Sequence, residues 1–273
     1  MSTIAVVAHH RRDDARILAD DVSAWLRARG HGVVTTDAPD VRTADLALVL
    51  GGDGTMLHAV HLLDGAPVPL LGVNMGHLGY LTEVEPTDVR DALGRWEQGS
   101  AAGRWHLDER MMLDISAAGA AGEPIGRWRA LNEAVVDKHE SGTVRLLVRI
   151  DGEPFTTYAA DGLIVATPTG STAYSLSARG PIVSPKHRAL LVTPVAPHML
   201  FDRTLVLDPT EEVVIEVLGE FGVTIAVDGR RTCDLTPGAV VRCSPSVATA
   251  RFVRFGERPY HQVLKAKFGL ADR

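Results

Sequence analysis

The feature that constrains this chain most is a buried-strand pattern that runs directly into a glycine-rich turn. Residues 46–50 are all apolar, and the sequence Gly-Gly-Asp-Gly-Thr follows at residues 51–55. A continuous apolar run is typical of a strand that is covered on both faces of a parallel sheet. The apolar positions after Thr55 have the spacing of a short amphipathic helix. The sequence therefore predicts a strand, a tight turn and a helix.

A turn of this kind is suited to binding an anion. Glycine lets the backbone approach a ligand closely, and the N–H groups at a helix N-terminus attract phosphate. Asp53 would repel a phosphate unless it has a task of its own. It can accept a proton from an attacking hydroxyl, or it can hold Mg²⁺ beside the phosphates. The simpler alternative is that Asp53 caps the helix.

A second glycine- and hydroxyl-rich block lies at residues 161–175 and reads Asp-Gly-Leu-Ile-Val-Ala-Thr-Pro-Thr-Gly-Ser-Thr-Ala-Tyr-Ser. Two such blocks in one chain are hard to explain as ordinary turns. A third short motif, Asn132-Glu133, precedes an apolar run at residues 134–136. These motifs together indicate a binding site built from several parts of the chain.

In combination, the motifs resemble the NAD kinase family, and the match continues through residues 175–183 and 194–198. The resemblance extends from about the first strand to about Arg230. It implies transfer of the γ-phosphoryl group of ATP, or of a polyphosphate, to the 2′-hydroxyl of the adenosine ribose of NAD. One position departs from the family pattern, because Arg179 stands where relatives usually have a second glycine. This difference predicts either a differently shaped turn or an extra cation.

The hydrophobic pattern predicts an α/β fold in the first part of the chain. Strands are predicted at residues 4–8, 31–36, 46–50 and 68–73, and helical patterns alternate with them. This alternation is typical of a Rossmann-like parallel sheet, in which ligands bind at the carboxyl ends of the strands. The glycine-rich residues 74–83 are predicted to form a loop over that site.

The pattern changes after a linker-like sequence at residues 99–103. Short β-like runs follow, separated by turn signals such as Asp-Gly, and they predict a β-rich, β-sandwich-like C-terminal domain. We therefore expect an α/β domain at residues 1–105 and a β-rich domain at 106–255. The resemblance implies that the tail at 256–273 returns to the first domain. The runs are at residues 111–115, 134–136, 144–150, 163–166, 190–192, 205–207, 213–218, 223–227 and 239–242.

Composition narrows the class of protein. The formal net charge is −6 over 273 residues, and there is neither a basic run nor an apolar span of bilayer length. We therefore expect no nucleic-acid or membrane partner. The N-terminus lacks a signal-like apolar segment, which favours a cytoplasmic enzyme. Cys233 and Cys243 are too few and too widely spaced for a zinc motif.

The phosphate site is expected at the first glycine block. The sequence contains no Gly-x-x-x-x-Gly-Lys-Ser/Thr loop, so another structure must hold the phosphates of the donor. The candidates are Gly51, Gly52, Gly54 and Thr55, together with Mg²⁺ or another divalent cation. Asp53 is the candidate general base.

The resemblance implies an NAD site by motif position. Asn132 and Glu133 supply donors and acceptors for the adenine edge and a ribose hydroxyl, or they form an ordinary turn. Tyr174 either stacks on a base or is a core residue, and His58 is either near the ligand or structural. The full set of candidate NAD-binding residues is Asp53, Gly54, His58, Asn132, Glu133, Asp161, Thr172, Ala173, Tyr174, Ser175, Ser177, Ala196 and Arg230. Residues 9–12 can meet the donor phosphates, or they can be a solvated loop.

We expect a homo-oligomer, either a homodimer or a homotetramer, because β-rich domains leave strand edges that need covering. The family assembles through this domain, and Asp161 is then expected to contact NAD bound to a neighbouring subunit.

Two other classes of protein share part of the pattern. Gly-Gly-Asp-Gly turns also occur in lipid kinases of the diacylglycerol and sphingosine type and in phosphofructokinases, although the other motifs favour NAD kinases. The other class is a non-catalytic dinucleotide sensor that keeps the fold and binds NADP. The presence of Asp53 argues against it, because a sensor needs no base. The sequence leaves open whether the donor is ATP or polyphosphate and whether the acceptor is NAD or NADH.

Overall fold

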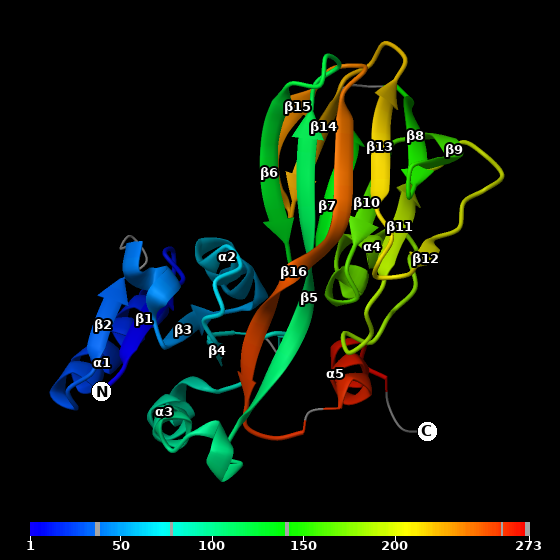
Figure 1. The fold of residues 1–273 in the computed structure, drawn as a ribbon. Helices are drawn as coiled ribbons and strands as arrows, with labels where there is room; N and C mark the ends of the chain where they lie inside the picture. The colour runs from blue at the N-terminus through cyan, green and yellow to red at the C-terminus, as the bar shows by residue number, and fades with distance from the viewer. Residues whose placement is uncertain (36–38, 77–78, 140–141, 258, 271–273) are drawn as a thin grey trace. The chain divides into compact units, whose positions relative to one another are not determined.

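The computed structural model describes residues 1–35, 39–76, 79–139, 142–257 and 259–270. The chain divides into two compact units. Unit 1 contains Met1–Glu109 and Thr249–Arg273, and unit 2 contains Arg110–Ala248. Figure 1 labels the helices and strands of both units.

Unit 1 is built on a parallel sheet in the order β2–β1–β3–β4. All three neighbouring pairs are parallel. β4 also pairs in parallel with β16 (Val240–Arg254), where Leu70 lies opposite Phe252. Every residue of β3 and β4 is buried, as the continuous apolar runs predicted. The strands are β1 (Thr3–Ala8), β2 (Gly32–Thr35), β3 (Leu46–Gly51) and β4 (Leu70–Asn74). The prediction of an α/β fold is confirmed.

The helices of unit 1 bury one face each. Helix α1 (Asp13–Ala28) buries Val22 and Leu26, and α3 (Val89–Glu97) buries Leu93 and Trp96. Helix α2 (Asp53–Leu63) begins inside the glycine turn, three residues before Met56, where the apolar spacing begins. Helix α5 (Tyr260–Lys267) lies near the C-terminus.

Unit 2 is a β-sandwich, as predicted. One layer is a sheet in the order β12–β11–β10–β7–β14–β15, and all its pairs are antiparallel. The other layer contains β16, β13, β8 and β9, with β5 paired to β16 and to β6. One hydrophobic core takes side chains from both layers, for example Leu146 of β8 and Val165 of β10.

The strands of the sandwich have the following bounds. They are β5 (His106–Ala118), β6 (Pro124–Ala130), β7 (Glu133–Lys138), β8 (Val144–Ile150), β9 (Glu153–Ala160), β10 (Gly162–Ala166), β11 (Leu190–Val195), β12 (Leu205–Leu207), β13 (Val213–Leu218), β14 (Val223–Val227), β15 (Arg230–Leu235) and β16 (Val240–Arg254). The predicted runs include no strand at β6, β9 or β15. β9 and β15 lie at the ends of their sheets, and β15 has Arg, Thr or Asp at most positions. The apolar residues of β9 do not alternate regularly with polar ones.

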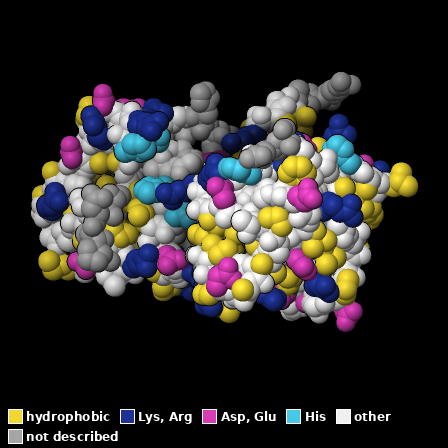
Figure 2. Space-filling view, turned by 90° about the horizontal axis from the view of Figure 1, so that it is seen from above, with side chains coloured by type: hydrophobic (Ala, Val, Ile, Leu, Met, Phe, Trp, Pro, Cys, Tyr) yellow, Lys and Arg dark blue, Asp and Glu magenta, His cyan; other side chains and the backbone are white. Residues whose placement is uncertain are grey.

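The surface shown in Figure 2 mixes hydrophobic, basic and acidic side chains. This mixture agrees with the small negative net charge of the sequence. Among the helices within the described ranges, none is long and apolar enough to cross a bilayer.

Candidate functional site

In unit 1, the glycine turn connects β3 to α2. A Cβ atom on Gly51 would overlap the side chain of Thr55, so only glycine fits there. A Cβ atom on Gly52 or Gly54 would meet no atom of the described residues within 4 Å, so these residues leave the space beside them open. The backbone N–H of Thr55 donates to the carbonyl oxygen of Gly52 over 2.9 Å. The turn is therefore tight on one side and accessible on the other.

Asp53 holds the loop that follows β4. Its Oδ2 accepts a hydrogen bond from the N–H of Tyr80 (2.9 Å), and its Oδ1 accepts one from the N–H of Leu81 (3.0 Å). A Cβ atom on Gly79 would overlap Oδ1, so this loop can approach the carboxylate only with glycine there. No side chain caps the N-terminus of α2 within the described structure, and the capping alternative for Asp53 is wrong. Residues 77 and 78 of the predicted loop lie outside the described residues.

Two basic residues that were not predicted from the sequence contact Asp53 or the loop that follows β4. Lys267 of α5 places its Nζ 3.7 Å from Oδ2 of Asp53. Arg254, at the end of β16, donates to the carbonyl oxygen of Leu81 (3.1 Å) and forms a buried ion pair with Glu83 (3.1 Å). Both residues follow the region of clear motifs, and no local pattern marks them.

The other candidates of unit 1 lie at the surface. His58 is exposed on α2, one turn after Asp53. The guanidinium of Arg12 donates to both carboxylate oxygens of Asp14, at 3.0 and 2.6 Å. Hydrogen bonding to Arg12 lowers the pKa of the Asp14 carboxyl group.

In unit 2, a carboxylate from a distant turn holds the Asn132-Glu133 motif. Asp228 accepts hydrogen bonds from the N–H groups of Leu131 (2.8 Å), Asn132 (2.7 Å) and Glu133 (3.1 Å). The φ angle of Asp228 is +46°, and the residue is buried. The sequence Asp228-Gly229 predicted a turn. That the carboxylate of Asp228 accepts hydrogen bonds from the Asn132-Glu133 motif could be seen only in the fold.

The second glycine block packs on the same motif. The N–H of Thr167 donates to the carbonyl oxygen of Asn132 (2.8 Å), and its hydroxyl donates to that of Leu131 (2.6 Å). The N–H of Gly170 donates to the hydroxyl oxygen of Thr167 (3.2 Å). The structure thus brings together two motifs that are more than 30 residues apart.

Glu133 is buried with one oxygen unsatisfied. The residue is 4 % exposed, and its Oε2 has no hydrogen-bond partner within the described part of the chain. Burial, and next the charge of Asp228, raise the pKa of Glu133 to about 8, while a hydrogen bond from the backbone of Tyr174 opposes the shift. At neutral pH this side chain is therefore a carboxylic acid, which can donate one hydrogen bond and accept others.

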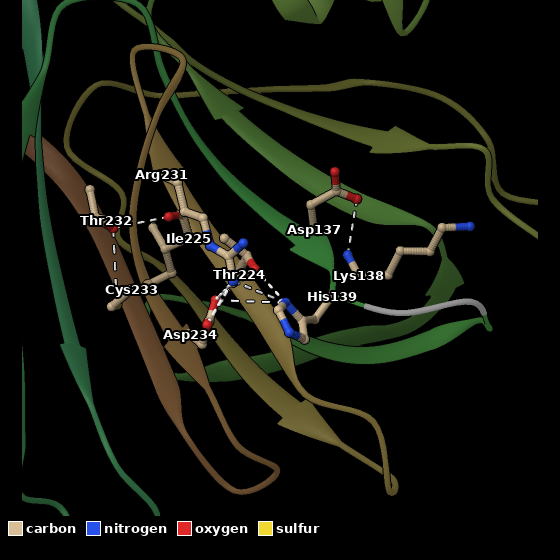
Figure 3. Close-up of polar contacts among 9 residues, drawn as sticks. All are labelled: Asp137, Lys138, His139, Thr224, Ile225, Arg231, Thr232, Cys233 and Asp234. Carbon is tan, nitrogen blue, oxygen red and sulfur yellow. Dashed lines mark hydrogen bonds and ion pairs between the residues drawn. The ribbon is translucent and has the colours of Figure 1, made fainter.

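A pocket of about 380 Å³ lies beside Glu133. Figure 3 shows the polar contacts on this part of unit 2. Arg231 donates to both oxygens of Asp234 (2.6 and 2.7 Å) and lies 3.1 Å from Nδ1 of His139. Lys138 pairs with Asp161 at 2.7 Å. The lining residues are Glu133, Val135, Asp137, Lys138, His139, Tyr174, Thr224, Ala226, Gly229 and Arg231.

The remaining candidates of unit 2 have different environments. Tyr174 is 38 % exposed and lines the pocket, so it is not a core residue. Ser175 is fully buried and shares a hydrogen bond with Thr193 (3.0 Å). Thr172 and Ala173 are half-buried, whereas Ser177, Ala196 and Arg230 are exposed.

Arg179 has a φ angle of +67°, in the left-handed region that favours glycine. The turn thus has a backbone conformation that glycine adopts most easily, with an arginine at that position.

No group of three His, Cys, Asp or Glu side chains that could hold a metal ion occurs among the residues that the structure describes. Mg²⁺ commonly binds through one or two carboxylates plus substrate phosphates and waters. Asp53 accepts two backbone hydrogen bonds, whereas a carboxylate has about four lone-pair positions. Asp53 therefore fits the role of a single carboxylate ligand beside the glycine turn.

Two family models match the chain. The model described as ATP-NAD kinase N-terminal domain matches residues 33–101. The model described as ATP-NAD kinase C-terminal domain matches residues 131–255. Together these matches cover most of both units.

Similar proteins match over the whole chain. NAD kinases of Syntrophotalea carbinolica and Acidobacterium capsulatum are 36% and 37% identical, with 100% of each chain covered. The structure is also similar to yeast NADH kinase complexed with NADH, with a TM-score of 0.89, 25% identity and coverage of 100% of this chain and 89% of that chain. An NAD kinase from Archaeoglobus fulgidus in complex with ATP has the same fold, with a TM-score of 0.73, 21% identity and coverage of 98% and 96%.

Proposed function

Because this chain belongs to the NAD kinase family, we infer that it transfers a phosphoryl group to the 2′-hydroxyl of the adenosine ribose of NAD and so produces NADP. The donor is ATP or polyphosphate. The observation that carries the mechanism is the position of Asp53, which opens α2 without a cap role and lies at the carboxyl end of a parallel strand. Ligands of open α/β sheets bind at this end.

Asp53 is the general base in this proposal. As the 2′-oxygen attacks the γ-phosphorus of ATP, the bond from that phosphorus to the bridging oxygen breaks and ADP leaves. The proton of the hydroxyl passes to the carboxylate of Asp53. The two hydrogen bonds from Tyr80 and Leu81 fix the direction of the carboxylate before the substrate arrives.

The open side of the glycine turn supports phosphate binding. Gly51 and Gly52 precede α2, and Gly54 and Thr55 lie in its first turn. N–H groups at a helix N-terminus commonly lack partners within the helix, although the N–H of Thr55 donates to Gly52. In the alternative role, Asp53 would instead hold Mg²⁺ or another divalent cation beside the phosphates, and the cation would neutralise charge on the transferring group. In this proposal the glycine turn holds the phosphates of the donor, and Asp53 orients the 2′-hydroxyl.

The NAD-binding residues are also a proposal. Asn132 and Glu133 are assigned to the adenosine of NAD, and Tyr174 beside them offers an exposed ring for stacking. The hydrogen bonds from Asp228 and Thr167 keep this motif rigid. The other proposed contacts are Asp53, Gly54, His58, Asp161, Thr172, Ala173, Ser175, Ser177, Ala196 and Arg230. Ser175 fits this set least well because its side chain is buried and bonded to Thr193.

We further propose a homodimer or homotetramer that acts in the cytoplasm. Strands β12 and β15 end the antiparallel sheet of unit 2 and leave edges that a second copy can cover. The cysteines Cys233 and Cys243 are free, which suits a reducing compartment.

The test of the proposed function is direct. Purified protein is incubated with NAD, Mg²⁺ and either ATP or polyphosphate, and NADP is detected with an NADP-specific dehydrogenase. Parallel reactions with NADH define the acceptor. Formation of NADP with either donor supports the proposal, and its absence under both conditions contradicts it.

A further inference from the structure

We propose that Lys267, in the C-terminal helix α5, is a positioning residue for Asp53 in phosphoryl transfer. Its Nζ lies 3.7 Å from Oδ2 of Asp53, and both residues belong to unit 1. The inference rests on the proposed function, because it concerns the base of that reaction.

The ammonium group of Lys267 is held where it can act on the carboxylate. It lies over the ring of Tyr80, 4.2 Å from the ring centroid, in the geometry of a cation–π contact. The backbone N–H of Tyr80 donates to the same oxygen of Asp53 that faces Lys267. One residue of the loop thus orients both the carboxylate and the ammonium.

Helix α5 is anchored to this loop at both of its ends. The ring of Tyr260, at the start of the helix, lies 6.4 Å from the ring of Tyr80. Lys267, at the last position of the helix, covers the same ring. Val263 between them is buried. The helix therefore presents Lys267 from a fixed direction.

The ion pair contributes little to the stability of the fold. The side chain of Lys267 is 27 % exposed and that of Asp53 is 31 % exposed, and ion pairs with this access to water are weak in measured stability. A contribution to the stability of the fold therefore does not explain why Lys267 lies beside Asp53. In the proposed reaction, a negatively charged phosphoryl group must come close to Asp53, and a cation beside the carboxylate reduces their repulsion.

Lys267 keeps its proton throughout the step, whereas Asp53 gains the proton of the hydroxyl. The ammonium holds the charged carboxylate in the direction set by Tyr80 and Leu81. Loss of the ammonium is expected to lower kcat and to leave the KM for NAD almost unchanged, because the adenosine contacts are assigned to residues of unit 2.

The test is a double-mutant cycle on the full chain. Lys267→Met is expected to lower kcat about tenfold, and Lys267→Arg to restore much of it because the cation returns. In an Asp53→Asn background, Lys267→Met is expected to change kcat by less than about twofold, because no carboxylate charge remains for it to act on. Lys265→Met, on the same helix, is the control with near-normal kcat. Thermal unfolding of each variant excludes loss of the fold.

Three results would overturn the inference. They are a normal kcat for Lys267→Met, an equal loss in both backgrounds, and no recovery with arginine while the protein stays folded. Failure of the proposed function would look different, because the wild-type protein itself would then form no NADP.

Discussion

Gly170 lies so close to Asn132 that a Cβ atom on Gly170 would overlap the carbonyl oxygen of Asn132. This contact joins the second glycine block to the motif that is assigned to the adenosine of NAD. It explains why the block needs glycine at this position, since the obstacle is backbone and cannot rotate away.

Gly170→Ala is therefore expected to destabilise the protein by about 2 kcal/mol or more, because the backbone of one motif must shift. Urea unfolding measures this change, and NAD affinity should fall with it. Gly94→Ala is the control, because a Cβ atom there meets no atom within 4 Å among the residues that the structure describes. Alanine in the interior of helix α3 is expected to stabilise by up to about 1 kcal/mol. Equal stability of Gly170→Ala and the wild-type protein would contradict the contact.

Because Glu133 is buried, we expect the free energy of unfolding to depend on pH. Its pKa is raised from 4.5 to about 8 in the folded protein. Below pH 4.5 the group is protonated in both states and imposes no cost on folding. As pH rises towards 8, the unfolded chain loses the proton first, so the folded state becomes relatively less stable. Each unit of pKa difference corresponds to about 1.4 kcal/mol.

Glu133→Gln should remove this dependence. The variant is expected to gain stability relative to the wild-type protein between pH 5.5 and pH 8, by a few kcal/mol at most. Urea unfolding at both pH values measures the difference, and Glu153→Gln, at an exposed position, is the control. If the difference between Glu133→Gln and wild type were the same at both pH values, Glu133 would not be the group that titrates.

Arg179→Gly is expected to stabilise the protein by about 0.5–1 kcal/mol. The φ of +67° costs an arginine more than a glycine, although glycine also gains freedom in the unfolded chain. Thermal unfolding detects the change. Arg188→Gly, at an exposed position without a positive φ, should be neutral or destabilising. A loss of stability in Arg179→Gly would mean that the arginine side chain has a role in the turn that outweighs the backbone cost.

Sedimentation tests the proposed assembly. The free edges of β12 and β15 lead us to expect a dimer or tetramer at assay concentrations. A single species of 29.3 kDa, the mass of one chain, would contradict this expectation.

The sequence predicted the parts of the structure that depend on local pattern. The buried strands β3 and β4 are continuous apolar runs, and the glycine turn between β3 and α2 follows from residues next to each other in the chain. The edge strand β15 was missed because most of its residues are polar, and β9 because its apolar residues do not alternate regularly with polar ones. The contacts of Asp228 with Asn132 and of Lys267 with Asp53 join residues far apart in the sequence, so only the fold could identify them.

If Asp53 accepts the proton of the 2′-hydroxyl, the turnover of Asp53→Asn must show the loss of that base. Asparagine has a similar size but one carbonyl oxygen, so it can keep only one of the two hydrogen bonds from Tyr80 and Leu81. Thermal unfolding controls for the resulting loss of stability. In the folded variant, kcat for NADP formation is expected to fall about 10²–10⁴-fold while NAD still binds. A near-normal kcat would contradict the mechanism.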